Sequence, residues 1–138
     1  MKEQFMKVLV AGVLAFVMPA RLPAQSLPMT VDIPFAFHLG DATLSSGRYI
    51  VRVQFGNVLQ ILAIEGGGIN VLTNAVTVRE TPATGSLEFR RYGNEYFLTK
   101  AFWKDNTYGR QLQKSKMEVE FARTNSPRTV QITTNSHE

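Results

Sequence analysis

Apolar side chains recur at every second position in short segments from residue 30 onward, and turn residues separate these segments. Such alternation is typical of strands that bury one face. The pattern predicts a mainly β domain, a single sandwich or flattened barrel of about seven antiparallel strands. We expect its ordered core over about residues 30–134, with strands at residues 31–39, 48–55, 58–64, 69–78, 86–92, 95–104 and 129–134.

The first segment shows the alternation most clearly. Its apolar face carries Val31, Ile33, Phe35, Phe37 and Leu39. His38 is expected on the opposite, outward face. Pro34 has no N–H to donate to a neighbouring strand, so we expect this strand at a sheet edge or unpaired on that side.

A Gly56-Asn57 pair predicts the first hairpin, because glycine at the first central position suits a two-residue type II′ turn. A two-residue loop fixes the register of the two strands. Phe55 is then expected opposite Val58, and Val53 opposite Gln60. This register leaves Gln60 as the polar exception on an apolar face.

Gly93-Asn94 predicts a second hairpin of the same kind. Its expected core face carries Leu87, Phe89, Tyr96, Leu98 and Phe102. The opposite face is mostly charged, and two large aromatic side chains, Phe97 and Trp103, do not fit there. Such breaks in a binary pattern often mark a functional surface or a second covered layer.

A short helix from Ser115 to Arg123 is predicted near the C-terminus, because residues 115–118 match the capping-box pattern. Met117 and Phe121 are four residues apart and share one helical face, whereas the alternation of Met117, Val119 and Phe121 would also fit a strand. The interpretation that we favour places this face over the two misplaced aromatic side chains and so completes a second small core.

The alternative interpretation leaves the aromatic side chains exposed. Phe97 and Trp103, together with Arg90 and Tyr92, would then form an interaction patch for a protein or glycan of the cell envelope.

The N-terminus has the pattern of a signal peptide. Residues 1–7 carry two lysines and residues 8–18 form an uninterrupted apolar run. This run of 11 residues is shorter than the roughly 20 residues that a membrane-spanning helix needs. We expect cleavage after Ala24, or alternatively after Ala20, export to the periplasm or the cell exterior, and a mature domain of residues 25–138.

Composition narrows the possible partners. Cysteine is absent, which excludes disulfides and thiolate sites. Removal of the signal segment takes three of 15 basic and one of 11 acidic residues, which leaves 12 against 10 and a net charge of +2. The basic residues do not form a run, so we expect no nucleic-acid partner.

No constellation of residues indicates a catalytic, metal or cofactor-binding site. The chain has two histidines, His38 and His137, too few for a zinc or iron site without cysteine. His38 with Asp41 could form an acid/base pair, although an exposed histidine without a role is the favoured interpretation. Residues 66–68, all glycine, fit a hairpin loop better than a phosphate-binding loop. Paired carboxylates of glycosidase type could come from Glu80, Glu88, Glu95, Glu118 and Glu120.

Several stretches resemble a family of small exported bacterial proteins of uncharacterised function. They are residues 33–41 (IPFAFHLGD) leading into 44–49 (LSSGRY), 91–103 (RYGNEYFLTKAFW) and 109–122 (GRQLQKSKMEVEFA). The family's first motif usually reads L-P-A-G-x-Y, whereas this chain has Ser45 and Ser46 in place of the proline and alanine. The resemblance implies an exported β domain and no particular activity, substrate or cofactor.

Together these observations predict a non-enzymatic exported module that binds or supports another macromolecule of the cell envelope. The alternative is a small β-barrel that carries an apolar ligand. A hydrolase with dispersed carboxylates is the least favoured hypothesis.

Overall fold

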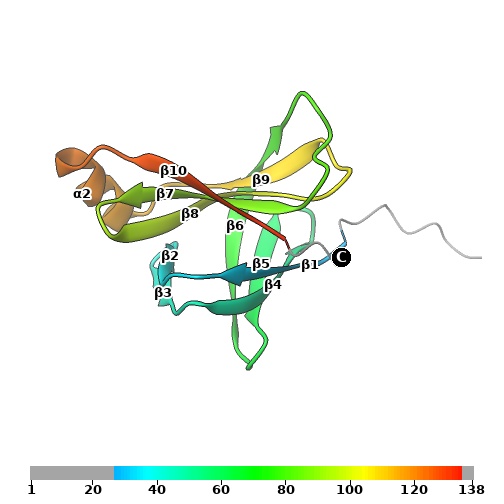
Figure 1. Ribbon diagram of the computed structural model, residues 1–138, viewed down its shortest axis with the longest axis horizontal. Helices are drawn as coiled ribbons and strands as arrows, with labels where there is room; N and C mark the ends of the chain where they lie inside the picture. The colour runs from blue at the N-terminus through cyan, green and yellow to red at the C-terminus, as the bar shows by residue number, and fades with distance from the viewer. Residues whose placement is uncertain (1–26, 135–138) are drawn as a thin grey trace, which may run out of the picture.

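The computed structural model describes residues 27–134, which form ten strands and one helix (Figure 1). The strands are β1 (Met29–Ile33), β2 (Phe37–Leu39), β3 (Ala42–Leu44), β4 (Gly47–Gln54), β5 (Val58–Ala63), β6 (Gly68–Thr77), β7 (Ser86–Tyr92), β8 (Glu95–Phe102), β9 (Tyr108–Leu112) and β10 (Arg128–Thr133). The helix α2 (Lys116–Thr124) precedes β10. The predicted mainly β fold with one short C-terminal helix is confirmed, and the predicted signal segment lies outside the described residues.

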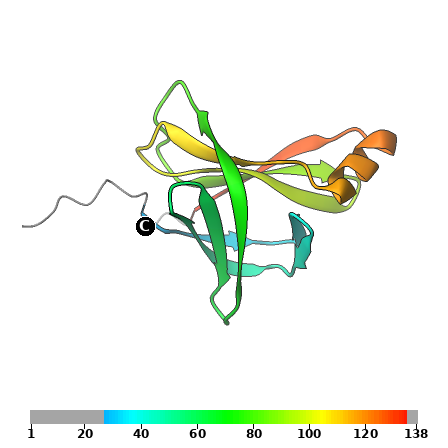
Figure 2. The same cartoon turned by 180° about the vertical axis from the view of Figure 1, so that it is seen from behind.

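All ten strands belong to one open sheet that folds over into two layers (Figure 1). Its order is β1-β4-β5-β6-β9-β8-β2-β3, and β7 pairs with both β8 and β10. The first half of β6 pairs with β5 and its second half with β9. Because of this division, β6 is shared by the two layers, as the view from behind shows (Figure 2).

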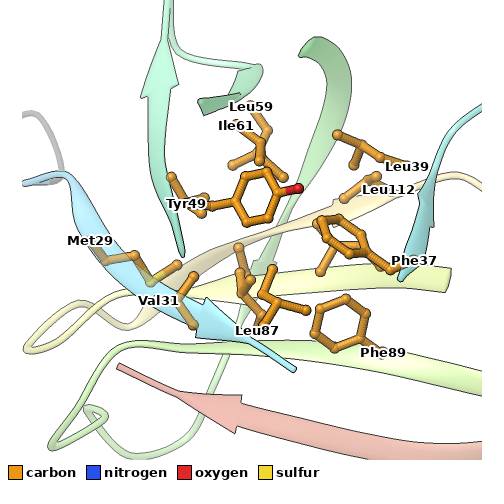
Figure 3. Packing of buried hydrophobic residues seen from close by; sticks show 14 of the residues in the cluster. Met29, Val31, Phe37, Leu39, Tyr49, Leu59, Ile61, Leu87, Phe89 and Leu112 are labelled. Atoms are coloured by element: carbon orange, nitrogen blue, oxygen red, sulfur yellow. The ribbon is translucent and has the colours of Figure 1, made fainter. Parts of the chain in front are cut away.

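The core fills the space between the layers (Figure 3). One layer supplies Val31, Tyr49, Val51, Leu59 and Ile61, and the other supplies Phe37, Leu39, Leu87, Phe89 and Leu112. The ring of Phe37 meets the rings of Tyr49 and Phe89 edge-on at centroid distances of 5.4 and 5.6 Å. Burial of these side chains is the main source of stability in a chain without disulfides.

The first apolar segment divides into two strands. Pro34 lies between β1 and β2, where the chain leaves the pairing with β4 and joins the other layer beside β8. The expected edge position is confirmed for β1, the first strand in the sheet order, but not for β2, which lies between β8 and β3. The expected number of about seven strands was too low. This division adds one strand, and β3 and β9 add two short strands that apolar alternation did not reveal.

The predicted register of β4 and β5 was wrong by one residue. Gln54, and not Phe55, pairs with Val58, so the turn contains three residues, 55–57. Phe55 takes up a left-handed backbone conformation with φ of 53° and leaves the strand.

The observed register explains the polar exception that the prediction left on the core face. Gln60 lies opposite Arg52 on the outer face, where its Oε1 accepts a hydrogen bond of 2.6 Å from Arg52 Nε. Leu59 and Ile61 point into the core instead. A shift of the register by one residue turns every side chain of a strand to the other face. A two-residue turn would therefore expose Leu59 and Ile61 to solvent, and their burial favours the three-residue turn.

The two-residue loop of the second hairpin is confirmed, since Tyr92 pairs with Glu95 across Gly93-Asn94. Leu87, Phe89 and Leu98 are buried as expected. The expectation that these three residues lie on the core face of the hairpin is therefore confirmed.

Further along β8 the predicted faces were wrong. A β-bulge shifts the register between Glu88 and Phe89, and Thr99 is the extra residue, whose hydroxyl donates a 2.8 Å hydrogen bond to the Glu88 carbonyl. A bulge reverses the alternation of the residues that follow it. Trp103 therefore enters the core, and the ring of Phe102 lies over Gly109 on the outer side.

Candidate functional site

The helix α2 begins at Ser115, whose hydroxyl accepts a 3.1 Å hydrogen bond from the Glu118 N–H. This N-cap confirms the predicted start of the helix. The ring of Phe121 lies 5.8 Å from that of Phe97 and covers it. Met117, the other residue expected to cover the aromatic side chains, is more than one-third exposed.

The structure brings together three of the four residues predicted to form an interaction patch. Arg90, Tyr92 and Phe97 lie beneath α2, whereas Trp103 belongs to the core between the layers. The three aromatic residues are buried, with exposed fractions of 1% for Tyr92, 2% for Phe97 and 4% for Trp103. In this structure they form parts of two cores and not an exposed patch.

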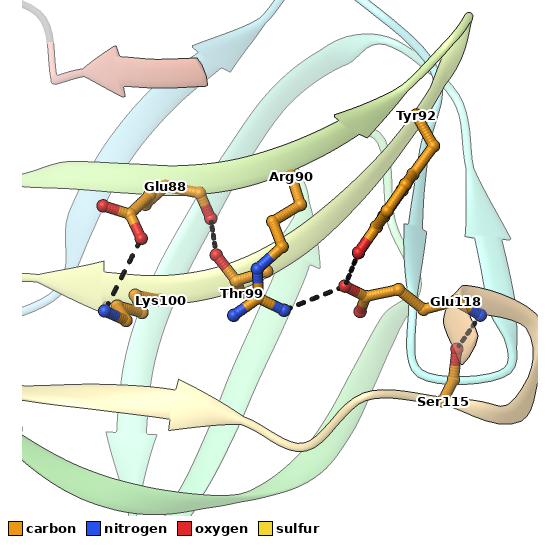
Figure 4. Close-up of polar contacts among 7 residues, drawn as sticks. All are labelled: Glu88, Arg90, Tyr92, Thr99, Lys100, Ser115 and Glu118. Carbon is orange, nitrogen blue, oxygen red and sulfur yellow. Dashed lines mark hydrogen bonds and ion pairs between the residues drawn. The ribbon is translucent and has the colours of Figure 1, made fainter. Parts of the chain in front are cut away.

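Glu118 joins the helix to the sheet through a buried carboxylate (Figure 4). Its Oε2 accepts a hydrogen bond of 2.8 Å from the Tyr92 hydroxyl and one of 2.9 Å from Arg90 Nη1. Glu118 is 3% exposed, and such a charge is tolerated in the interior only when it is paired and hydrogen-bonded. Glu118 was predicted as part of the capping box, and no pattern in the sequence indicated its contact with β7.

Burial raises the pKa of the Tyr92 hydroxyl above its usual value. The hydrogen bond to Glu118 and the negative charge of that carboxylate raise it further, while Arg90 acts in the opposite direction. The phenol therefore stays protonated at neutral pH and keeps donating to Glu118. These contacts hold α2 against β7.

His38 lies on the face opposite Phe37 and Leu39, as expected, but it is buried and not exposed. The alternative pair with Asp41 is not formed, because both ring nitrogens contact other residues. Because β2 joins β8 with His38 opposite Phe97, the imidazole stacks on that ring at a centroid distance of 4.5 Å. Its Nδ1 lies 3.0 Å from Thr43 Oγ1, and its Nε2 lies 3.2 Å from Glu95 Oε2. Both ring nitrogens are engaged, and the histidine ties β2 to the β7–β8 hairpin.

Large apolar side chains are also exposed at a second place, the outer face of β5 and β6 near the β4–β5 turn. Phe55 is 89% exposed and Leu72 is 73% exposed, and Val58 is the register partner of Leu72. The turn lies against β6, because Thr73 N–H and Thr73 Oγ1 both donate to the Asn57 carbonyl at 2.9 Å. We call Phe55, Leu72 and the half-buried Val58 the exposed apolar cluster.

Phe55 is unfavourable here in two respects. A left-handed backbone costs a residue with a side chain about 1–2 kcal/mol, and the exposed ring gains almost nothing from burial. The adjacent Gly56 has a φ of 81°, which glycine adopts freely. This feature was not predicted, because Phe55 was expected in a strand, where an aromatic residue is ordinary.

Within residues 27–134 no helix is long and apolar enough to cross a membrane. In the same part of the chain no group of three or more histidine, aspartate or glutamate side chains could hold a metal ion. Comparisons of the chain with models of protein families, with curated proteins and with solved structures gave no significant match. Inferences about function therefore depend on the chain's own surfaces.

Proposed function

We propose that this protein is a non-enzymatic exported module that binds a protein of the cell envelope through the exposed apolar cluster. The observation that carries the proposal is Phe55, a large aromatic residue held in a strained turn with its side chain in water. Strained residues of this kind tend to occur at functional sites, where the strain is retained for what the side chain contacts.

The chemistry of the cluster favours a protein surface over a glycan. Leu72 and Val58 add aliphatic area on the outer face next to the β4–β5 turn, and such side chains bind by burial against other apolar groups. A central aromatic anchor surrounded by smaller contacts is the usual arrangement of a binding hot spot.

Export is the second part of the proposal, and the N-terminal sequence supports it. A basic start followed by an apolar run of 11 residues is the pattern of a signal peptide. N-terminal sequencing of protein recovered from the cell envelope tests it: a start at Gln25 or Arg21 is expected, and an intact Met1 would contradict export.

Binding is tested by retention of the protein on isolated envelope fractions, with Phe55→Asn as the main variant and Tyr108→Asn as the control. Tyr108 is an exposed aromatic residue that lies outside the cluster, on β9. We expect Phe55→Asn to lower the affinity at least about 10-fold, because hot-spot residues contribute on this scale, and Tyr108→Asn to leave it unchanged.

Pretreatment of the fractions distinguishes the two classes of partner. Digestion with a protease is expected to abolish retention, and digestion of the glycan is expected to leave it intact. The opposite pattern, or equal retention of Phe55→Asn and the unmodified protein, would refute the proposal.

The hypothesis of an apolar-ligand carrier has less support. The sheet is open, and buried side chains of both layers occupy the space in which a ligand would have to lie.

A further inference from the structure

The strand β6 is longer than either of its neighbours can cover. Its ten residues pair with β5 over residues 68–72 and with β9 over residues 73–77. On the side where β5 lies, the second half of β6 therefore has no neighbouring strand (Figure 2). This gap in the sheet begins at the β4–β5 turn, where Thr73 N–H donates to the Asn57 carbonyl.

The hydrogen bonds at the two ends of the gap show which residues face it. Thr73 donates toward β5, and Val78 donates toward β9 to the Thr107 carbonyl at 2.9 Å. Backbone groups alternate in direction along an antiparallel strand. Ala75 and Thr77 therefore point their N–H and C=O groups into the gap, and we call these two residues the open edge.

The open edge has no partner among the residues that the structure describes, and both of its members are exposed. Proteins usually guard an unpaired edge with lysine, proline, a bulge or a very short strand. Residues 72–78 (LTNAVTV) contain no charge, no proline and no glycine, and they are rich in β-branched residues. Such a segment readily pairs with another strand.

We propose that the open edge pairs with the open edge of a second copy of this chain, antiparallel and about a two-fold axis. In this arrangement Ala75 faces Thr77 of the second copy and Thr77 faces Ala75 of the second copy. Every N–H and C=O of the two residues then gains a partner in both copies. Val76 lies on the axis and faces its own counterpart.

The length of the segment fits this occupant. In the stated register, residue 79 of the second copy reaches the level of Thr73, where Asn57 of the β4–β5 turn already pairs with Thr73 and closes the gap. The chain bends away at residues 79–80, so the incoming strand ends where the gap ends. Residues 72–78 are uncharged, so no like charges meet between Ala75 and Thr77 of the two copies. The contact ends at Thr73, whose carbonyl and Oγ1 accept hydrogen bonds of 2.9 and 2.8 Å from the Arg110 guanidinium, and Arg79 of the second copy bends away there. A two-fold contact is the commonest form of self-association.

A disulfide tests the register in a chain that has no cysteine of its own. Residues opposite one another in a non-hydrogen-bonded antiparallel pair have Cα atoms about 4.5 Å apart, within the range that a disulfide spans. We expect Val76→Cys to give a covalent dimer under mild oxidation. The control Asn74→Cys lies on the same strand, but its counterpart would be four residues along, roughly 14 Å away, so it should stay monomeric.

A second variant tests the hydrogen bonds without a new cross-link. Ala75→Pro removes an N–H that points into the gap and leaves the bonds of Asn74 and Val76 to β9 in place. We expect sedimentation to show dimers for the unmodified protein and monomers for Ala75→Pro. If Ala75→Pro does not fold, Val76→Lys replaces it, because two lysines would then face each other on the axis.

Three results would overturn the proposal: a monomeric unmodified protein at its highest soluble concentration, a dimer that survives Ala75→Pro or Val76→Lys, or equal cross-linking of Asn74→Cys and Val76→Cys. A strand from another protein in the gap would give the first of these results. The proposal is independent of the exposed apolar cluster, and Phe55→Asn is expected to stay dimeric.

Discussion

Two aromatic residues of this molecule, Tyr92 and Phe55, make opposite contributions to its stability. Tyr92 is buried and uses its hydroxyl to stabilise a buried carboxylate, so its position contributes to folding. Phe55 is exposed, has an unfavourable backbone conformation, and contributes little to the core. Substitutions at these two positions should therefore change stability in opposite directions.

Substitution of Phe55 by asparagine or glycine is expected to stabilise the protein by about 1 kcal/mol, because both residues accept a positive φ more readily than phenylalanine. Urea unfolding of Phe55→Asn, Phe55→Gly and Phe55→Ala measures the effect. Alanine keeps the backbone penalty and serves as the control, so its stability should stay near that of the unmodified protein. A loss of stability in the glycine variant would show that the ring makes a structural contribution.

Tyr92→Phe removes a hydrogen bond to a buried carboxylate and should cost about 1.5–3 kcal/mol at neutral pH. Because burial and Glu118 raise the pKa of Tyr92 in the folded protein, its contribution is fully present below the unfolded pKa of about 10. This contribution to stability is lost as the pH rises through the pKa that Tyr92 has in the folded protein. The stability difference between the unmodified protein and Tyr92→Phe should therefore shrink at alkaline pH.

Urea unfolding at a series of pH values from neutral to above 10 measures the difference in the free energy of unfolding between the unmodified protein and Tyr92→Phe. Tyr108→Phe changes an exposed tyrosine and is the matched control. A difference between Tyr92→Phe and the unmodified protein that stays constant above pH 10 would argue against the contact of Tyr92 with Glu118.

Among the secondary-structure elements, α2 depends on a single cap and on its contact with the sheet. Ser115→Ala removes the acceptor for the Glu118 N–H and should destabilise the protein by about 1 kcal/mol. Ser115→Asn retains an acceptor and should cost little. Thermal unfolding of both variants checks the expectation, and equal losses would show that the hydroxyl has no capping role.

The two Gly-Asn pairs show how far sequence patterns predict a register. Around Gly93-Asn94 the two-residue loop and the buried face agree, and the predicted pairing of Tyr92 with Glu95 is correct. Around Gly56-Asn57 the same rule fails, because a two-residue loop would place Gln60 in the core. The polar residue on an apolar face was the signal that the turn is longer.

The candidate site was less predictable than the fold. Binary patterning identified Phe97 as covered by the helix, but the bulge at Thr99 moved Trp103 to the other face. A bulge depends on a local hydrogen bond, here from the Thr99 hydroxyl to a carbonyl, and leaves no periodic trace in the sequence. The contact between Glu118 and Arg90 joins positions 28 residues apart, which local patterns do not connect.

At the scale of the whole molecule, β6 determines how the two layers relate. The strand pairs with β5 in one layer and with β9 in the other, so neither layer can separate without breaking a ladder of β6. The same length of β6 leaves the open edge unpaired. One feature of the topology thus joins the layers and provides the proposed contact with a second copy.

Because β6 is shared, the described domain should unfold in one cooperative transition. Trp103 is the one tryptophan of the chain and lies in the core, so its fluorescence reports core packing, while far-ultraviolet circular dichroism reports the sheet. The two signals should coincide during urea unfolding. Leu59→Ala in one layer and Leu87→Ala in the other should each cost about 2–5 kcal/mol and move both signals together. Separate transitions, with fluorescence insensitive to Leu59→Ala, would mean that each layer folds by itself and that β6 does not couple them.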